Sequence, residues 1–253
     1  MAFSNKYIIF FAVVVCLVCS LAVSALAVAL KEQQEANKRT DQYENVLRVA
    51  GLLGATEKKS GPEVLALMES KVRSFVIDRK SGEVDPSIAP ADFDQRKAAR
   101  SETTSEAVSF DAARRAQIKR LPEKLLVYEV TEPGKESYIL PISGNGLWST
   151  LYGYLCVAKD AQTVRGLTYY EHGETPGLGG EVDNPGWKQL WPGKQIYDAS
   201  GQPQLEVVKG TAGNDHQVDG LSGATITSNG VSAMLDVWLG DNGFKPFLDK
   251  MRR

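Results

Sequence analysis

The sequence predicts an α+β fold, in which a single N-terminal transmembrane helix precedes a soluble domain with a mixed, largely antiparallel sheet and flanking helices. Three observations predict this class. Residues 8–30 form an uncharged apolar run, short strand-like runs separated by glycine-containing turns occupy residues 124–208, and an apolar period of 3.6 residues begins at Val231.

The apolar run from Ile8 to Leu30 contains 23 residues without a charge, a proline or a glycine. As a helix with a rise of 1.5 Å per residue it would be about 34 Å long, enough for a hydrocarbon core of about 30 Å. A cleaved secretory signal is the alternative, with Ala25-Leu26-Ala27 as its cleavage site. Because the apolar region of a signal spans only about 7–15 residues, we expect a retained anchor in contact with membrane lipid.

The residues around this run give a weak charge signal for orientation. The tail at 1–7 carries Lys6 and a free amine, whereas Lys31, Lys38 and Arg39 follow the run. A tail this short favours a cytoplasmic N-terminus at the inner membrane. The C-terminal domain would then be periplasmic.

We divide the chain into four segments: a cytoplasmic tail at 1–7, a transmembrane anchor at 8–30, juxtamembrane helices with a charged insertion at 31–135, and a domain at 136–253. Asp41 and Glu44 resemble a capping box for a helix that would stop near Gly51 and Gly54. A second helix is predicted over 62–73. Strands are predicted at 125–130, 138–142, 151–158, 164–170 and 205–208, and the run at 151–158 is apolar on both faces, as in an interior strand.

Composition excludes several function classes. The net charge of −2 implies no large basic surface, so nucleic acid is not an expected partner. Cys16 and Cys19 form a C-x-x-C pair inside the apolar run, but two thiols cannot complete a four-ligand metal site without thiols from a partner chain. His172 and His216 have no Cys or carboxylate partners at metal-ligand spacing, and neither a P-loop nor a G-x-S-x-G motif is present.

The segment from Asp219 to Ser228 places hydroxyls and small residues ahead of a helical pattern. A helix N-terminus in this segment would favour a phosphate, through its free N–H groups and its dipole. Gly223 and Ala224 would let a bulky ligand reach the backbone. The alternative is that Ser and Thr merely cap the helix. The pattern itself is apolar at i, i+3, i+4, i+7 and i+8: Val231, Met234, Leu235, Trp238 and Leu239.

The run Asp219-x-x-Ser222-Gly223-Ala224-Thr225 resembles the flavinylation motif of the FMN-binding domain family. The resemblance implies that FMN is joined to Thr225 through a phosphoester bond, and that a flavin transferase installs it from FAD with magnesium. Thr227 remains an alternative acceptor, since the helix-terminus argument does not separate the two threonines.

Two further stretches match the same family. Residues 171–179 resemble its H-x-E-T-P-G-L-G loop, in which Glu174 and Thr175 would offer polar contacts to the flavin. Gly177 would allow a tight turn, and Leu178 would lie flat on the ring. Residues 143–148 resemble its G-x-G-x-W turn, which adds Gly144 and Trp148 to the cofactor-binding residues. Trp148 taken alone would more often be a core anchor.

The resemblance spans the whole chain and makes residues 136–253 an FMN-binding domain. Length and the segment 55–135 favour the branch of C subunits of sodium-translocating NADH:quinone oxidoreductases. The resemblance implies that this chain is a covalent-FMN electron carrier. It would act within a multi-subunit respiratory complex that passes electrons from NADH toward ubiquinone and exports Na⁺. No NADH or quinone site is expected in this chain. The alternatives are the G subunit of an Rnf-type electron-transport complex and a non-redox membrane-anchored module.

Overall fold

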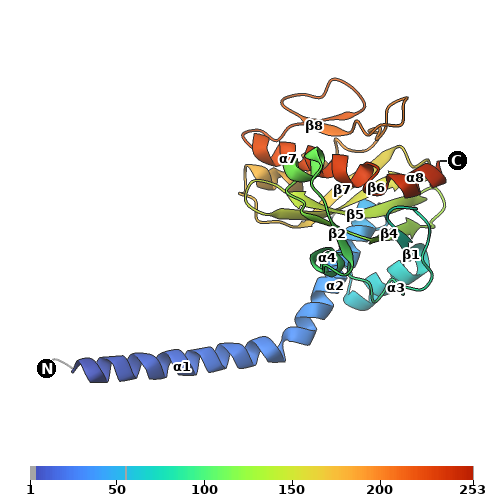
Figure 1. Cartoon of the computed structure of the whole chain (residues 1–253). Helices are drawn as coiled ribbons and strands as arrows, with labels where there is room; N and C mark the ends of the chain where they lie inside the picture. Colours follow the sequence, from blue (N-terminus) through green and yellow to red (C-terminus); the bar gives the residue numbers. More distant parts are fainter. Residues whose placement is uncertain (1–3, 55, 253) are drawn as a thin grey trace. The chain divides into compact units, whose positions relative to one another are not determined.

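The computed structural model describes residues 4–54 and 56–252, and the chain separates into two compact units, Met1–Gln42 and Tyr43–Arg253 (Figure 1). The first unit contains α1 (Asn5–Ala29), which Ser4 caps by accepting a hydrogen bond from the Tyr7 amide. This helix is long and apolar enough to cross a membrane, in agreement with the predicted anchor.

The helix α2 (Lys31–Val49) begins in the first unit and ends in the second. The predicted capping box at Asp41 is wrong, because α2 passes through that residue without interruption. Residues 31–40 are good helix formers without proline or glycine, so nothing stops the helix there. The predicted stop is confirmed at Gly51, where φ is +68°.

A five-stranded antiparallel sheet organises the second unit, with the strand order β1-β4-β5-β6-β7. Two small pairs lie outside it, of which β8 and β9 are parallel. The predicted α+β class with a largely antiparallel sheet is therefore confirmed. The strands are β1 (Val72–Asp78), β2 (Ser105–Ala107), β3 (Arg120–Pro122), β4 (Lys124–Val130), β5 (Ser137–Asn145), β6 (Thr150–Ala158), β7 (Val164–Glu171), β8 (Glu206–Val208) and β9 (Gln217–Asp219).

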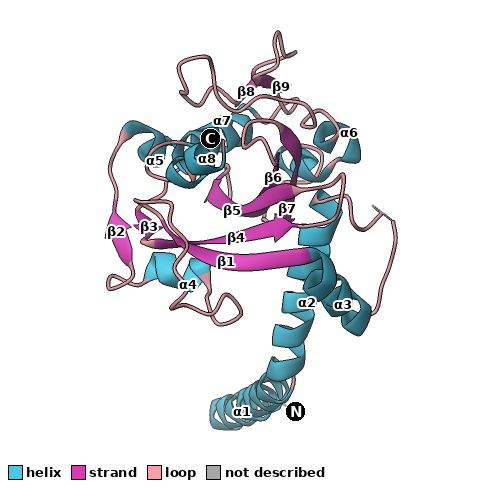
Figure 2. Cartoon of the chain, turned by 90° about the vertical axis from the view of Figure 1, so that its right-hand side faces the viewer, coloured by secondary structure: helices cyan, strands magenta, loops and turns pink. Residues whose placement is uncertain are grey.

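Helices lie on both faces of the sheet (Figure 2), and an apolar core lies on each face. Along β6, Leu155 and Val157 join the core on one face, whereas Tyr154 and Cys156 join the core on the other, so β6 is the predicted interior strand. One face is covered by α5 (Asp111–Arg115), α7 (Thr225–Leu239) and α8 (Lys245–Met251), and the other by the end of α2 and by α3 (Gly61–Lys71). The remaining helices are α4 (Gln95–Arg100), η1 (Gly179–Asp183) and α6 (Pro185–Lys188).

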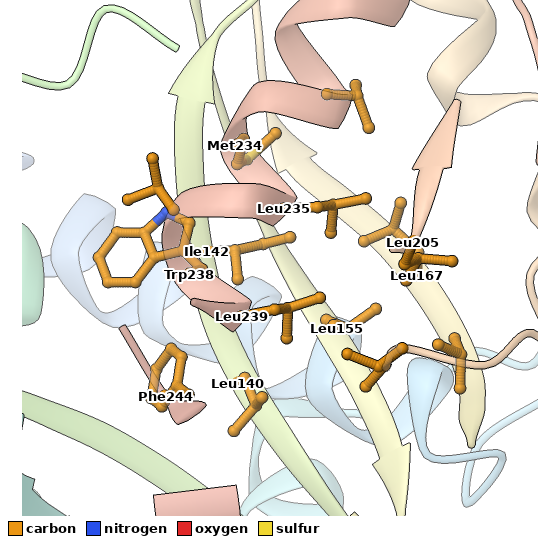
Figure 3. Packing of buried hydrophobic residues seen from close by; sticks show 14 of the residues in the cluster. Leu140, Ile142, Leu155, Leu167, Leu205, Met234, Leu235, Trp238, Leu239 and Phe244 are labelled. Atoms are coloured by element: carbon orange, nitrogen blue, oxygen red, sulfur yellow. The ribbon is translucent and has the colours of Figure 1, made fainter. Parts of the chain in front are cut away.

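The long helix α7 lies along the sheet with the apolar face that the sequence period predicts (Figure 3). Its residues Leu235 and Leu239 are fully buried, and Trp238 Nε1 donates a 2.7 Å hydrogen bond to the carbonyl of Ser143 in β5. This packing holds the C-terminal half of α7 on β5, and Gly230 nearer its start lies against the carbonyl of Asn145, the last residue of β5.

One prediction about the N-terminal half needs correction. The helix predicted over 62–73 ends at Lys71, because Val72 begins β1 and pairs with Val130. The sheet also takes β1 and β4 from the segment before residue 136, and the compact unit begins at Tyr43. The domain boundary at 135/136 stays a prediction.

Candidate functional site

Thr225 is the first residue of α7 and is exposed. The N-cap is Ala224, and no side chain in the part of the chain that the structure describes caps this helix. The N–H groups of the first turn are therefore left for an anion. Gly223, which precedes the cap, has a φ of +70°, a left-handed conformation that favours glycine.

The hydroxyls of this segment differ in their surroundings. Thr227 is 1% exposed, and its Oγ1 donates a 2.7 Å hydrogen bond to Oε2 of Glu174. Ser228 is also buried, and its Oγ accepts a 3.1 Å hydrogen bond from the Leu221 amide. Ser222 and Thr225, in contrast, are exposed. Only these two hydroxyls of the 222–228 segment are open to a reagent in solution.

Glu174 is the polar centre of the site, and its residue is 5% exposed. Its Oε1 accepts hydrogen bonds from the amides of Trp148 at 2.9 Å and Ser149 at 3.1 Å, and its Oε2 accepts one from the amide of Leu147 at 3.2 Å. Burial on its own raises the pKa of Glu174, but the Thr227 hydroxyl and these three amides together hold that pKa below its ordinary value. The group is therefore a carboxylate at neutral pH.

This carboxylate joins the three stretches that the sequence analysis singled out. It belongs to the 171–179 loop and binds both the 143–149 turn and the first turn of α7. Glu174 was predicted to offer a polar contact to a flavin, but the structure directs its oxygen atoms to the protein's own amides and hydroxyl. These hydrogen bonds connect the three stretches, and the predicted contact of Glu174 with a flavin stays a prediction.

Glycines allow this close packing around Glu174. A Cβ added at Gly179 would lie 2.5 Å from Oε2 of Glu174 and 2.6 Å from Oγ1 of Thr227, and one at Gly146 would lie 2.8 Å from the Glu174 carboxyl carbon. The predicted site residue Gly144 packs against α7. A Cβ there would lie 2.8 Å from the Cβ of Met234, so glycine lets β5 approach α7.

Four large apolar side chains are exposed on the three stretches that meet at Glu174. We call Leu147, Trp148, Leu178 and Ile226 the apolar rim; they are 47%, 71%, 45% and 57% exposed, respectively. Leu178 lies against the motif, since a Cβ added at Gly223 would be 3.1 Å from its Cδ2. Exposed apolar side chains on stretches that meet at one residue favour a binding surface at this site.

Two members of the apolar rim, Leu178 and Trp148, were predicted, whereas Leu147 and Ile226 were missed. The exposure of Trp148 contradicts the alternative that it is a core anchor. Ile226 had a detectable signal, because it precedes the apolar period of α7 and falls outside its buried face.

Thr175 and Gly177 shape the loop that carries Leu178. The carbonyl of Thr175 accepts hydrogen bonds from the amides of Leu178 at 3.1 Å and Gly180 at 2.9 Å, and Gly177 has a φ of +76°. The Thr175 side chain is exposed beside them. Its predicted contact with a flavin stays a prediction.

Asp219 fastens the strand that leads into the motif. Its Oδ1 accepts a 2.7 Å hydrogen bond from the Ala212 amide, and its carbonyl accepts a 2.9 Å bond from Trp187 Nε1. These contacts place Asp219 in the support of the loop.

His172 takes part in two hydrogen bonds. His172 accepts a 3.2 Å bond from the Glu174 amide at Nδ1, so we assign the proton to Nε2, which lies 2.7 Å from Oδ2 of Asp183. Within residues 4–54 and 56–252, no group of three or more His, Cys, Asp or Glu side chains could hold a metal ion. Cys16 and Cys19 lie exposed on α1.

The arrangement fits a phosphorylated molecule that carries a flat apolar ring. The phosphate would meet the uncapped N–H groups of α7 beside the exposed Thr225 hydroxyl, and the ring would meet the apolar rim. FMN has both parts, and the donor set in this site is compatible with it.

Comparison with known proteins gives a consistent result. The model of the FMN-binding domain family matches residues 146–240. The C subunit of the Na(+)-translocating NADH-quinone reductase of Pseudomonas aeruginosa is 46% identical over 248 residues, which cover 96% of this chain and 94% of that protein. Its counterpart in Yersinia pestis is 45% identical over 244 residues, covering 95% and 90%.

Solved structures extend the similarity to the fold. The crystal structure of NqrC from Shewanella oneidensis matches with a TM-score of 0.77 at 37% identity and covers 86% of this chain and 99% of that one. The crystal structure of the corresponding reductase component from Parabacteroides distasonis matches with a TM-score of 0.66 at 31% identity, covering 87% and 96%.

Proposed function

This chain belongs to the family of C subunits of Na(+)-translocating NADH-quinone reductases, and on that premise we propose that it holds FMN as a phosphate ester on Thr225. It is the FMN-binding electron-carrier subunit of this sodium-pumping complex and works together with the complex's other subunits. The Rnf alternative is not favoured, because the C subunits match over nearly the whole chain.

One observation carries the choice of Thr225. Thr225 is exposed at the first position of α7, whereas Thr227 is buried and donates its hydroxyl proton to Glu174. An acceptor hydroxyl must be reachable by the donor of the phosphoryl group. Of the two threonines, Thr225 alone meets this requirement.

Bound FMN supplies one- or two-electron transfer chemistry. The chain's own residues fix its position. The first-turn N–H groups and the dipole of α7 would hold the phosphate, and the apolar rim would cover ring surface that otherwise faces water. An ester at the phosphate leaves the ring itself unmodified for exchange of electrons with neighbouring centres.

The ester would be formed by a flavin transferase that uses FAD and magnesium. A bond forms between Oγ1 of Thr225 and the phosphorus of the riboflavin phosphate half, and the pyrophosphate bond to AMP breaks. AMP leaves with the electron pair, and the hydroxyl proton passes to solvent. Nothing is oxidised or reduced in this step.

We propose that α1 anchors the chain in the inner membrane with the N-terminus in the cytoplasm and the unit Tyr43–Arg253 in the periplasm. A covalent bond would prevent loss of FMN in a compartment where it is not replenished. Cys16 and Cys19 would take part in a metal site only if partner subunits supplied further thiols.

Denaturing gel electrophoresis with detection of flavin fluorescence tests the attachment. The full chain, co-expressed with a flavin transferase, should give a fluorescent band that Thr225→Val abolishes. The control Ser222→Ala, which removes the other exposed hydroxyl, should keep the band. A dark wild-type band would contradict the proposal and favour a non-redox module. A fluorescent Thr225→Val band would contradict attachment at Thr225 and indicate another acceptor residue.

A further inference from the structure

We propose that Glu174 is the positioning residue of the flavin site: it aims Thr225 outward, fixes half of the apolar rim, and places a fixed negative charge beside the cofactor. The proposal rests on the attachment at Thr225 proposed above. It assigns to one buried side chain a function that its motif alone does not reveal.

The side chains of Thr225 and Thr227, both in the first turn of α7, point in opposite directions. An α-helix has 3.6 residues per turn, so side chains two positions apart point in directions that differ by about 200°. The hydroxyl of Thr227 is drawn inward by its 2.7 Å bond to Glu174. Thr225, two residues earlier, is thereby turned toward solvent.

The Glu174 carboxylate also holds the turn that precedes β6. It accepts hydrogen bonds from the amides of Leu147, Trp148 and Ser149 at 2.9–3.2 Å, and the side chains of the first two residues form half of the apolar rim. The acceptor hydroxyl and the surface for the ring are therefore set by the same carboxylate. Gly146 and Gly179 leave it no room to shift, since a Cβ at either would lie within 3 Å of its carboxyl group.

The Glu174 carboxylate also carries a negative charge. Every hydrogen-bond partner of the Glu174 carboxylate that the structure describes is an amide or a hydroxyl, so no bonded cation neutralises it. Reduction adds negative charge to a flavin. A fixed carboxylate nearby disfavours that charge and lowers the reduction potential, because buried charges are weakly screened.

The test uses the full chain with Glu174→Gln, which keeps the side chain's size and removes its charge. Glu181→Gln is the matched control, because Glu181 follows in the same region and bonds to Asn184 at 2.7 Å. When the protein is made without the transferase, the amides of residues 147–149 should exchange hydrogen at least about tenfold faster in Glu174→Gln than in wild type. A tenfold ratio corresponds to about 1.4 kcal/mol. In chain made with the transferase, intact mass should show a several-fold smaller flavinylated fraction.

The loaded fraction provides a readout that loss of structure alone would not move. Its adduct should still map to Thr225, and its midpoint potential should be more positive in Glu174→Gln than in wild type or Glu181→Gln. A second pair of variants isolates the hydroxyl partner. Thr227→Val should reduce flavinylation while Thr227→Ser restores it, which keeps the test decisive if Glu174→Gln does not fold.

Wild-type exchange at 147–149 together with wild-type flavinylation in Glu174→Gln would overturn the positioning role. An unchanged midpoint potential would overturn the role of the charge. Absence of any adduct on wild-type Thr225 would instead overturn the proposed function. The exchange measurement on unmodified chain would still decide whether Glu174 holds the turn.

Discussion

Oγ1 of Thr227 lies 2.7 Å from Oε2 of Glu174, a residue 53 positions earlier in the chain. This contact separates two threonines that are chemically alike. Thr227 supports the loop that contains Glu174, and Thr225 is left exposed at the start of α7.

Removing the Thr227 hydroxyl should destabilise the chain. Hydrogen bonds to charged groups contribute about 1.5–3 kcal/mol, so Thr227→Val should lower the free energy of unfolding by about that amount. Thr227→Ser keeps the hydroxyl and should lose less. Urea unfolding of the full chain in detergent measures both, and equal losses in the two variants would show that the hydrogen bond does not matter.

A methyl group at Gly179 should disrupt the site from within. Its Cβ would lie 2.5 Å from Oε2 of Glu174, and overpacking of this kind costs about 1–3 kcal/mol. Gly179→Ala should therefore lower stability and the flavinylated fraction together. Gly173→Ala is the control from the same loop, because its nearest contact would be an ordinary 3.4 Å. If intact mass and unfolding curves did not distinguish the two variants, the close packing around Glu174 would be refuted.

The contribution of Glu174 to stability should depend on pH. Its pKa is lowered in the folded chain, so the ionised group stabilises the fold. This stabilisation is fully present above the unfolded pKa of about 4.3 and is lost as the pH falls through the folded pKa. The difference in unfolding free energy between wild type and Glu174→Gln should be constant near neutrality and shrink below about pH 4.3. A difference that stays constant down to pH 3 would contradict the assignment of an ionised Glu174.

The Cys156 thiol should be unreactive in the folded chain. It is fully buried in β6, and burial raises the pKa of Cys156 to about 11. An unfolded thiol has a pKa of about 8.5, so at pH 7.5 the folded thiolate fraction is roughly 300-fold smaller. In a Cys16→Ala, Cys19→Ala background, iodoacetamide should label Cys156 in urea but not in native chain. Rapid native labelling would show that the sheet face carrying Cys156 opens.

Much of the sheet could be predicted from the sequence. The runs at 125–130, 138–142 and 151–158 are short and apolar, and each corresponds to a strand of the structure. Strand β1 was missed because it follows the helical pattern of 62–71 directly and exposes Arg73 and Ser74 at the sheet edge. Its pairing with β4, about 50 residues later, is a tertiary choice that local pattern does not encode.

The motifs predicted which stretches meet at the site but not how their side chains point. From the resemblance of its loop to the family motif, Glu174 was expected to offer a polar contact to the flavin. Its inward direction depends on amides and a hydroxyl supplied by distant segments. For the same reason the sequence could not separate Thr225 from Thr227, whose difference is one of burial.

We expect the hydroxyl of Thr225 to carry FMN through a phosphate ester. The most direct test is peptide mass mapping of the native full chain isolated from cells that contain a flavin transferase. The peptide containing Thr225 should be heavier by the mass of FMN less one water. Fragmentation should place the addition on Thr225. Finding that peptide at its unmodified mass, or the addition on Thr227, would contradict it.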